Sequence, residues 1–152
     1  MSSFRIPFLA RSIVGVALLA VMLLAGCGTT FTNPASGKVV QVVAAENFWG
    51  SIAAQVGGSH VHVTSIIVDP NADPHSYEPT GQDARMVADA RYVIVNGVGY
   101  DPWADQLLQA NPASGRKELN VGDLFGKHAG DNPHMWYNPD YVTAVANKIR
   151  DD

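Results

Sequence analysis

Two histidines, each directly after a proline in the sequence, are the residues of this chain best suited to chemistry. One lies in residues 73–75 (Asp-Pro-His) and the other in residues 132–134 (Asn-Pro-His). Proline fixes its own backbone and restricts the residue before it, so each imidazole is held on a stiff loop. Imidazole nitrogen is a preferred zinc ligand, at about 2.0–2.1 Å from the metal. We therefore predict that His75 and His134 bind one metal ion, provided that the fold brings them together.

The elements that must position these loops alternate in type along the chain. Parallel strands joined by helices of about ten residues are typical of βαβ units, so we expect an α/β fold with about four parallel strands flanked by helices. Ligands bind such sheets at the carboxyl ends of the strands. The patterns predict strands over 38–44, 60–68, 92–95 and 117–121, helices over 47–56, 80–90, 101–110 and 139–150, and loops over 69–79 and 122–133.

The first 37 residues have a different character. Residues 13–25 form an almost unbroken apolar run behind Arg5 and Arg11, which is typical of a secretory signal and too short for a span of about 20 residues. Residues 24–27 (Leu-Ala-Gly-Cys) resemble the bacterial lipobox, which implies cleavage before Cys27 and lipidation of its thiol. We predict a signal peptide over residues 1–26, a flexible tether over 27–37 and a single domain over 38–152.

The charge of the processed chain excludes one class of partner. Both signal arginines are lost on cleavage, which leaves eight Lys and Arg against fourteen Asp and Glu, a net charge of −6. Nucleic-acid binding calls for a basic face, so we expect no nucleic-acid partner. An acidic surface suits a protein that binds cations.

The histidine loops belong to a wider pattern. With residues 46–49 (Glu-Asn-Phe-Trp), 57–58 (Gly-Gly), 78–80 (Glu-Pro-Thr) and 95–97 (Val-Asn-Gly), the chain resembles the zinc/manganese solute-binding lipoproteins of metal ABC transporters, known as cluster A-I. The resemblance covers about residues 38–150. It implies two lobes of parallel βα units, joined by a long helix, with the metal in the cleft between them.

The resemblance also implies the ligands. The N-terminal lobe of that family supplies two histidines, whose counterparts here are His75 and His134, and the C-terminal lobe supplies a histidine or glutamate and an aspartate. Because the chain has about half the expected length, we interpret residues 38–152 as the N-terminal metal-binding lobe alone, and the sequence as a fragment that lacks the C-terminal lobe.

The function implied by the resemblance is transport rather than catalysis. Such a protein is an extracytoplasmic receptor, periplasmic or lipid-anchored to the bacterial cell membrane through Cys27, that delivers zinc or manganese to an ABC transporter permease. Two alternatives stay open: a zinc-dependent hydrolase and a surface adhesin-type lipoprotein. The sequence lacks a His-Glu-x-x-His motif or another tight ligand pair with an adjacent base, so we expect no enzyme activity.

Glu46 and Asn96 each follow the end of a predicted strand, near where the ligands are expected. We predict that they contact the side chains that bind the metal and do not bind the metal themselves. For Asn96, the capping of a turn is an equally good interpretation.

Other histidines and aromatic residues have simpler interpretations. His60 and His62 alternate onto one face of a predicted strand, where we expect exposed or half-buried side chains. His128 lies in a short loop with no further histidine, so we expect no metal-scavenging role for it. Trp49 and residues 136–137 (Trp-Tyr) could wall a cleft, although aromatic residues at such places are more often part of the core.

Overall fold

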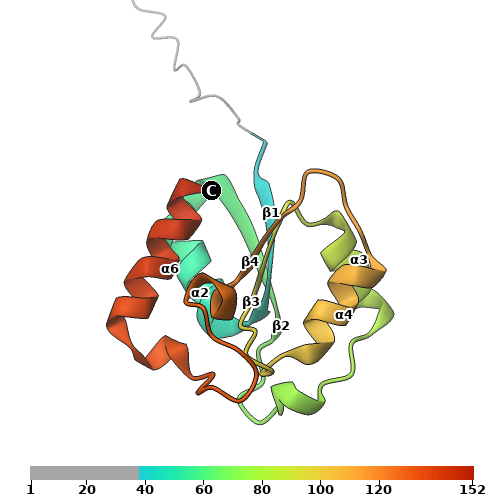
Figure 1. Ribbon diagram of the computed structural model, residues 1–152. Helices are drawn as coiled ribbons and strands as arrows, with labels where there is room; N and C mark the ends of the chain where they lie inside the picture. The colour runs from blue at the N-terminus through green and yellow to red at the C-terminus, as the bar shows by residue number, and fades with distance from the viewer. Residues whose placement is uncertain (1–37) are drawn as a thin grey trace, which may run out of the picture. The chain divides into compact units, whose positions relative to one another are not determined.

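A computed structural model describes residues 38–152 and contains a single sheet of parallel strands, in the order β2-β1-β3-β4 (Figure 1). The predicted signal peptide, the tether and Cys27 lie outside the described residues. The predicted α/β fold with four parallel strands is confirmed. The strands are β1 (Val40–Glu46), β2 (Val61–Ile67), β3 (Tyr92–Val95) and β4 (Lys117–Asn120).

Helices cover both faces of the sheet (Figure 1). On one face lie α2 (Asn47–Gly57) and α6 (Pro139–Asp151), and on the other lie α3 (Gly81–Asp89) and α4 (Pro102–Ala110). Four shorter elements lie in the connections: η1 (Gly58–His60), η2 (Pro74–Ser76), α5 (Val121–Leu124) and η3 (Met135–Tyr137).

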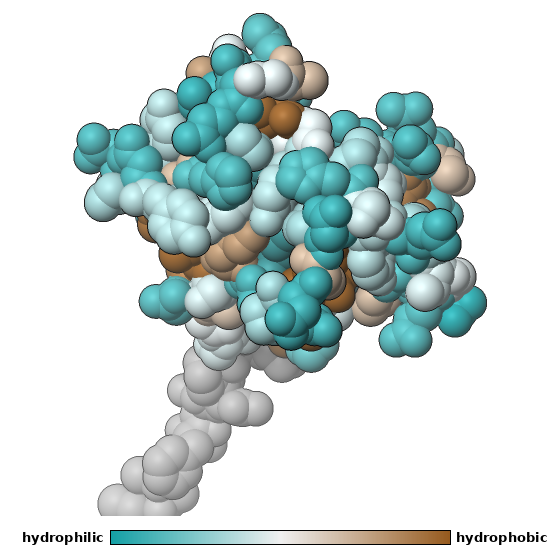
Figure 2. All heavy atoms as spheres, turned by 90° about the horizontal axis from the view of Figure 1, so that it is seen from below, coloured by the Kyte–Doolittle hydropathy of each residue, from teal (hydrophilic) through white to brown (hydrophobic). Residues whose placement is uncertain are grey.

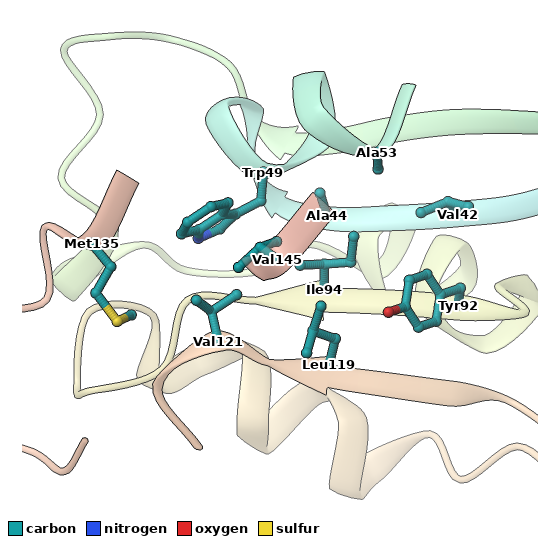
Figure 3. Close-up of a cluster of buried hydrophobic side chains, with 10 residues drawn as sticks. All are labelled: Val42, Ala44, Trp49, Ala53, Tyr92, Ile94, Leu119, Val121, Met135 and Val145. Atoms are coloured by element: carbon teal, nitrogen blue, oxygen red, sulfur yellow. The ribbon is translucent and has the colours of Figure 1, made fainter. Parts of the chain in front are cut away.

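The alternation of side chains along the strands divides the core into two layers, as expected for a parallel sheet buried on both faces. Even-numbered residues of β1 and β3 face α2 and α6, and odd-numbered residues face α3 and α4. The first layer is drawn in Figure 3 and comprises Val42, Ala44, Trp49, Ala53, Tyr92, Ile94, Leu119, Val121, Met135 and Val145. The second layer includes Val43, Ala45, Val87, Val93, Val95, Trp103 and Leu107.

Two predicted helix starts are confirmed by their caps. The Thr80 hydroxyl accepts backbone N–H groups of Gln82 and Asp83, and the Asp83 carboxylate accepts the N–H of Thr80, so the two residues form a capping box. At α6, the Asn138 side chain accepts the N–H of Asp140. Both helices therefore begin where short polar side chains satisfy free backbone donors.

Several sequence-based boundaries are wrong by one or two residues, and three of the differences change the assignment of a residue or loop discussed above. β1 continues to Glu46, which is the last strand residue rather than one beyond the strand. His60 belongs to η1, because the turn at the C-terminus of α2 tightens into a 3₁₀ segment, so His60 and His62 do not alternate along one strand. The predicted loop over 122–133 instead begins within α5, where the Asn120 side chain accepts the N–H of Asp123.

Within residues 38–152, no helix is both long enough and apolar enough to cross a membrane.

Truncation of the central strand should cost more stability than truncation of its surroundings. Ile94 is 0% exposed, whereas Val39 is 43% exposed. We expect Ile94→Ala to lower the free energy of unfolding by about 2–5 kcal/mol, because it leaves a cavity between β3 and α2. Urea unfolding measures this, with Val39→Ala as the control. Equal losses in the two variants would contradict the assigned core.

Candidate metal centre

The two predicted ligands lie on loops at the carboxyl end of the sheet, the lower edge of Figure 1. His75 lies in η2, which follows β2, and His134 directly precedes η3, which follows β4 and α5. Tyr100 lies on the connection from β3 to α4. Figure 2 views this end from below and shows a mostly hydrophilic surface with small apolar areas.

Tyr100 brings the two histidines into one neighbourhood. Its ring centroid is 5.0 Å from that of His75 and 6.0 Å from that of His134, both in edge-to-face geometry. Residues 59 positions apart in the sequence therefore pack against the same tyrosine. Burial, with the nearby acidic groups Glu46, Asp73 and Asp101, raises the pKa of Tyr100, so its hydroxyl stays protonated at neutral pH.

The two Asx-Pro-His loops use the same hydrogen bonds. Asp73 Oδ1 accepts the backbone N–H of His75 at 3.1 Å and lies 2.9 Å from its Nδ1. Asn132 Oδ1 accepts the N–H of His134 at 3.0 Å and lies 2.8 Å from its Nδ1. In each loop, one side-chain oxygen fixes both the turn and the imidazole.

These contacts determine which ring nitrogen is free. The hydrogen bonds from His75 and Ser76 lower the pKa of Asp73, so its ionised oxygen only accepts. Asn132 Oδ1 is likewise an acceptor. Nδ1 of each ring must therefore carry the hydrogen, which leaves the Nε2 lone pair for a metal. Both histidines are exposed, so that lone pair is accessible.

The carbonyl oxygen of the proline in each loop also accepts a hydrogen bond from a buried side chain. Trp103 Nε1 donates to Pro74 O at 3.1 Å, and Asn96 Nδ2 donates to Pro133 O at 3.1 Å. The two donors are buried and belong to different parts of the β3–α4 region. Each loop is thereby tied to the protein interior at the residue next to its histidine.

An aromatic surface surrounds the pair. Phe48 stacks on Trp136 with ring centroids 3.9 Å apart, and Tyr100 lies 5.1 Å from Trp136. These three residues, with Glu46, Pro74 and Tyr137, line an open hollow of about 270 Å³. Trp49, in contrast, is fully buried and belongs to the core, whereas Trp136 and Tyr137 line the hollow.

Asn96 and Glu46 are both buried beneath this surface, at 0% and 1% exposure. Asn96 accepts a hydrogen bond from Trp49 Nε1 at 2.9 Å, in addition to its bond to Pro133. The Asp101 carboxylate accepts the backbone N–H groups of Asn96 and Gly97, both at 2.7 Å. Among the described residues, Glu46 receives no hydrogen bond at either carboxylate oxygen.

The remaining histidines lie elsewhere. His60 borders a separate, largely apolar hollow lined mainly by residues of β1, α2 and α6, and His62 and His128 are exposed. Within residues 38–152, no three His, Cys, Asp or Glu side chains are grouped to hold a metal ion. Residues 38–152 thus offer a histidine pair rather than a full coordination shell.

Three contributors to this site were not predicted from the sequence: Tyr100, Asp101 and Trp103. Residues 99–103 (Gly-Tyr-Asp-Pro-Trp) carry a usable signal, because an Asp-Pro pair at a helix start, a few residues after a strand, marks a short connection at the carboxyl edge. The sequence gives no sign that the Asp101 side chain points back to β3 rather than capping α4.

Comparison with known proteins identifies the family. The family model described as "ZnuA: Zinc-uptake complex component A periplasmic" matches residues 42–152. The chain belongs to this family. The match includes both histidine loops and the β3–α4 connection that lies between them in the sequence.

The sequence identity between this chain and individual relatives in the family is 27–28%. The manganese-binding lipoprotein MntA of Halalkalibacterium halodurans is 28% identical over 147 residues, covering 90% of this chain and 47% of MntA. The iron ABC transporter substrate-binding lipoprotein MtsA of Streptococcus pyogenes is 27% identical over 140 residues, covering 84% and 45%. The chain spans about half the length of these curated relatives.

A solved structure supports the fold. The manganese-bound form of a mutant periplasmic metal binding protein from Candidatus Liberibacter asiaticus superposes with a TM-score of 0.63 at 24% identity. The match covers 74% of this chain and 43% of that one. The shared architecture is the parallel sheet with helices on both faces.

The loop hydrogen bonds make a prediction about the imidazole tautomers. In the metal-free full chain at pH 8, we expect both His75 and His134 to carry their hydrogen on Nδ1, observed by long-range nitrogen–proton NMR. Asp73→Ala should shift His75 toward the Nε2–H form and leave His134 unchanged, because each ring depends on its own Asx oxygen. Asn132→Ala, the matched control, should reverse the pattern. Equal effects on both rings would contradict two independent loops.

Proposed function

We propose that this chain captures a divalent transition-metal ion, zinc or manganese, through Nε2 of His75 and Nε2 of His134. The observation that carries the proposal is the matched construction of the two loops. Each presents an exposed imidazole with its hydrogen held on Nδ1 and packs it against Tyr100. A hydrogen-bonded Nδ1 fixes the tautomer and raises the basicity of a metal-binding Nε2.

The ion is proposed as cargo for an ABC importer rather than as a catalytic cofactor. MntA and MtsA are described as a manganese-binding and an iron-transporter lipoprotein, and the matched family as a zinc-uptake component. By analogy, this chain serves as the extracytoplasmic receptor of a metal permease. It would be held at the bacterial cell membrane by a lipid on Cys27.

Two ligands are half of the tetrahedral set that zinc prefers. We propose that the other donors come from a second lobe that closes over the hollow beside Tyr100, in keeping with relatives about twice as long as this chain. Carboxylates in that lobe would favour manganese, and a further imidazole would favour zinc.

The hydrolase and adhesin alternatives receive no support from these comparisons. The relatives and the structure described above are named for metal or substrate binding. We propose that the protein has no enzyme activity. Hydrolysis of an ester or phosphate reporter by the zinc-loaded chain would overturn that assignment.

Removal of either ligand should abolish most of the metal affinity. We expect His75→Ala and His134→Ala each to weaken zinc binding at pH 7.5 by more than about tenfold, since loss of even a supporting group typically costs 10- to 100-fold. Competition with a chromogenic chelator measures the affinity. His60→Ala and His62→Ala are the matched controls and should stay close to the parent. Unchanged affinity in His75→Ala would refute the proposed site.

Acidification should release the metal. Protons and metal compete for the same imidazole nitrogen, so zinc affinity should fall steeply between pH 7.5 and pH 5.5. Calorimetric titration in several buffers should also detect protons released on binding at the lower end of this range. An affinity that stayed flat across the range would remove histidine from the account.

A further inference from the structure

Beneath the histidine pair lie two buried carboxyl groups, and no Lys, Arg or His side chain among residues 38–152 forms an ion pair with either of them. Glu46 ends β1, and Asp101 precedes α4. They are 1% and 2% exposed. An ionised carboxylate at such depth ordinarily needs a cationic or hydrogen-bonding partner, because burial removes its water.

The sheet explains why Glu46 points into this position. In the β1–β3 register Ala44 pairs with Ile94, so two residues further along Glu46 comes opposite Asn96. Both continue the even-numbered series that faces α2 and α6. Trp49 of α2 covers this spot and donates to Asn96 rather than to Glu46.

The donors present are divided unequally between the two acids. Asp101 accepts two backbone N–H groups, from Asn96 and Gly97. Within the described residues, neither oxygen of Glu46 accepts a hydrogen bond, and Glu46 lies opposite Asn96, whose backbone N–H donates to Asp101. Two ionised carboxylates repel and cannot hydrogen-bond. A single proton on Glu46 removes the repulsion and supplies the missing bond to Asp101.

We propose that Glu46 is a positioning residue, which as a neutral acid donates to the Asp101 carboxylate and thereby holds the turn that carries Tyr100 and the loop that carries His134. This inference rests on the proposed metal-binding function. It assigns a role to a residue that does not itself touch the ion.

The path from Glu46 to the ligands is short. Asp101 fixes the backbone of Asn96 and Gly97, and the Asn96 side chain holds the carbonyl of Pro133, next to His134. Tyr100, the neighbour of Asp101, packs against both imidazoles. Displacement of Asp101 would therefore move both Tyr100 and the loop that carries His134.

The electrostatics agree with this assignment. Burial, together with the charge of Asp101, raises the pKa of Glu46 well above its usual value. Burial also raises the pKa of Asp101, but the two backbone N–H groups oppose that shift. Within the described residues, Asp101 and the Tyr100 hydroxyl are the titratable groups that act on Glu46.

The sign of the pH effect follows from this shift. A carboxyl whose pKa is higher in the folded chain contributes stability at low pH, and that contribution is lost as pH rises toward the folded pKa. Glu46→Gln keeps an N–H donor for Asp101 and cannot titrate. The ratio of the unfolding constants of the parent and Glu46→Gln should therefore change by up to tenfold per pH unit above pH 5, with the parent losing stability.

The experiment combines that ratio with zinc affinity in the full chain. Urea unfolding is followed from pH 5 to pH 9 for the parent, Glu46→Gln and a matched control, Glu78→Gln, which removes an exposed carboxylate from the loop before α3. The control should show no such change in ratio. A flat or reversed ratio for Glu46→Gln would mean that Glu46 is ionised, and would overturn the proposal.

The metal arm tests positioning separately. At pH 7.5, Glu46→Met, which has a similar length and no donor, should bind zinc at least about tenfold more weakly than the parent. Glu46→Gln should recover most of that loss. If Glu46→Met bound zinc as tightly as the parent, the proposed positioning role of Glu46 would be wrong. The proposed hydrogen bond between Glu46 and Asp101 would not be affected by that result. A parent chain that bound no zinc would refute the proposed function, while the stability ratio would still test the pair.

Discussion

The site depends on the way β3 ends. Asp101 accepts the N–H groups of both Asn96 and Gly97, which would otherwise be unpaired donors buried at the sheet edge. These bonds hold a turn in which Gly97 and Val98 both have positive φ, at 71° and 60°. Such a conformation costs a residue with a side chain about 1–2 kcal/mol. The turn sets the direction of Tyr100, and Tyr100 lies against both histidines.

The sheet determines where the histidine loops lie, and hydrogen bonds within the loops determine how the imidazole rings are oriented. The strand order 2-1-3-4 changes direction between β1 and β3, so the loops after neighbouring strands diverge and leave room at that edge. Orientation of the rings comes from local bonds, since Asp73 and Asn132 each hold a backbone N–H and an Nδ1 with one oxygen. The loops differ in charge, because only Asp73 adds a formal negative charge behind its imidazole.

Features set by local sequence could be predicted, and features set by packing could not. The alternation of strands and helices and the proline before each histidine are local features. The first correctly predicted the parallel sheet, and the second marked the two loops that lie against Tyr100. The role of Asp101 was missed because a residue before a helix ordinarily caps it, whereas here its side chain bonds backward to β3. Glu46 was placed two residues beyond the end of its predicted strand because an acid is rarely predicted within a buried strand.

A histidine pair on one lobe has a consequence for how a transported ion would be held. If His75 and His134 each gave one nitrogen, two tetrahedral positions would have to be filled by other donors. Among residues 38–152, no three His, Cys, Asp or Glu side chains are grouped to hold a metal ion. An ion bound at this lobe alone would therefore keep water in its remaining positions and exchange readily. Tight binding would then require donors that arrive when the hollow beside Tyr100 is covered, so capture and release would both follow from opening and closing.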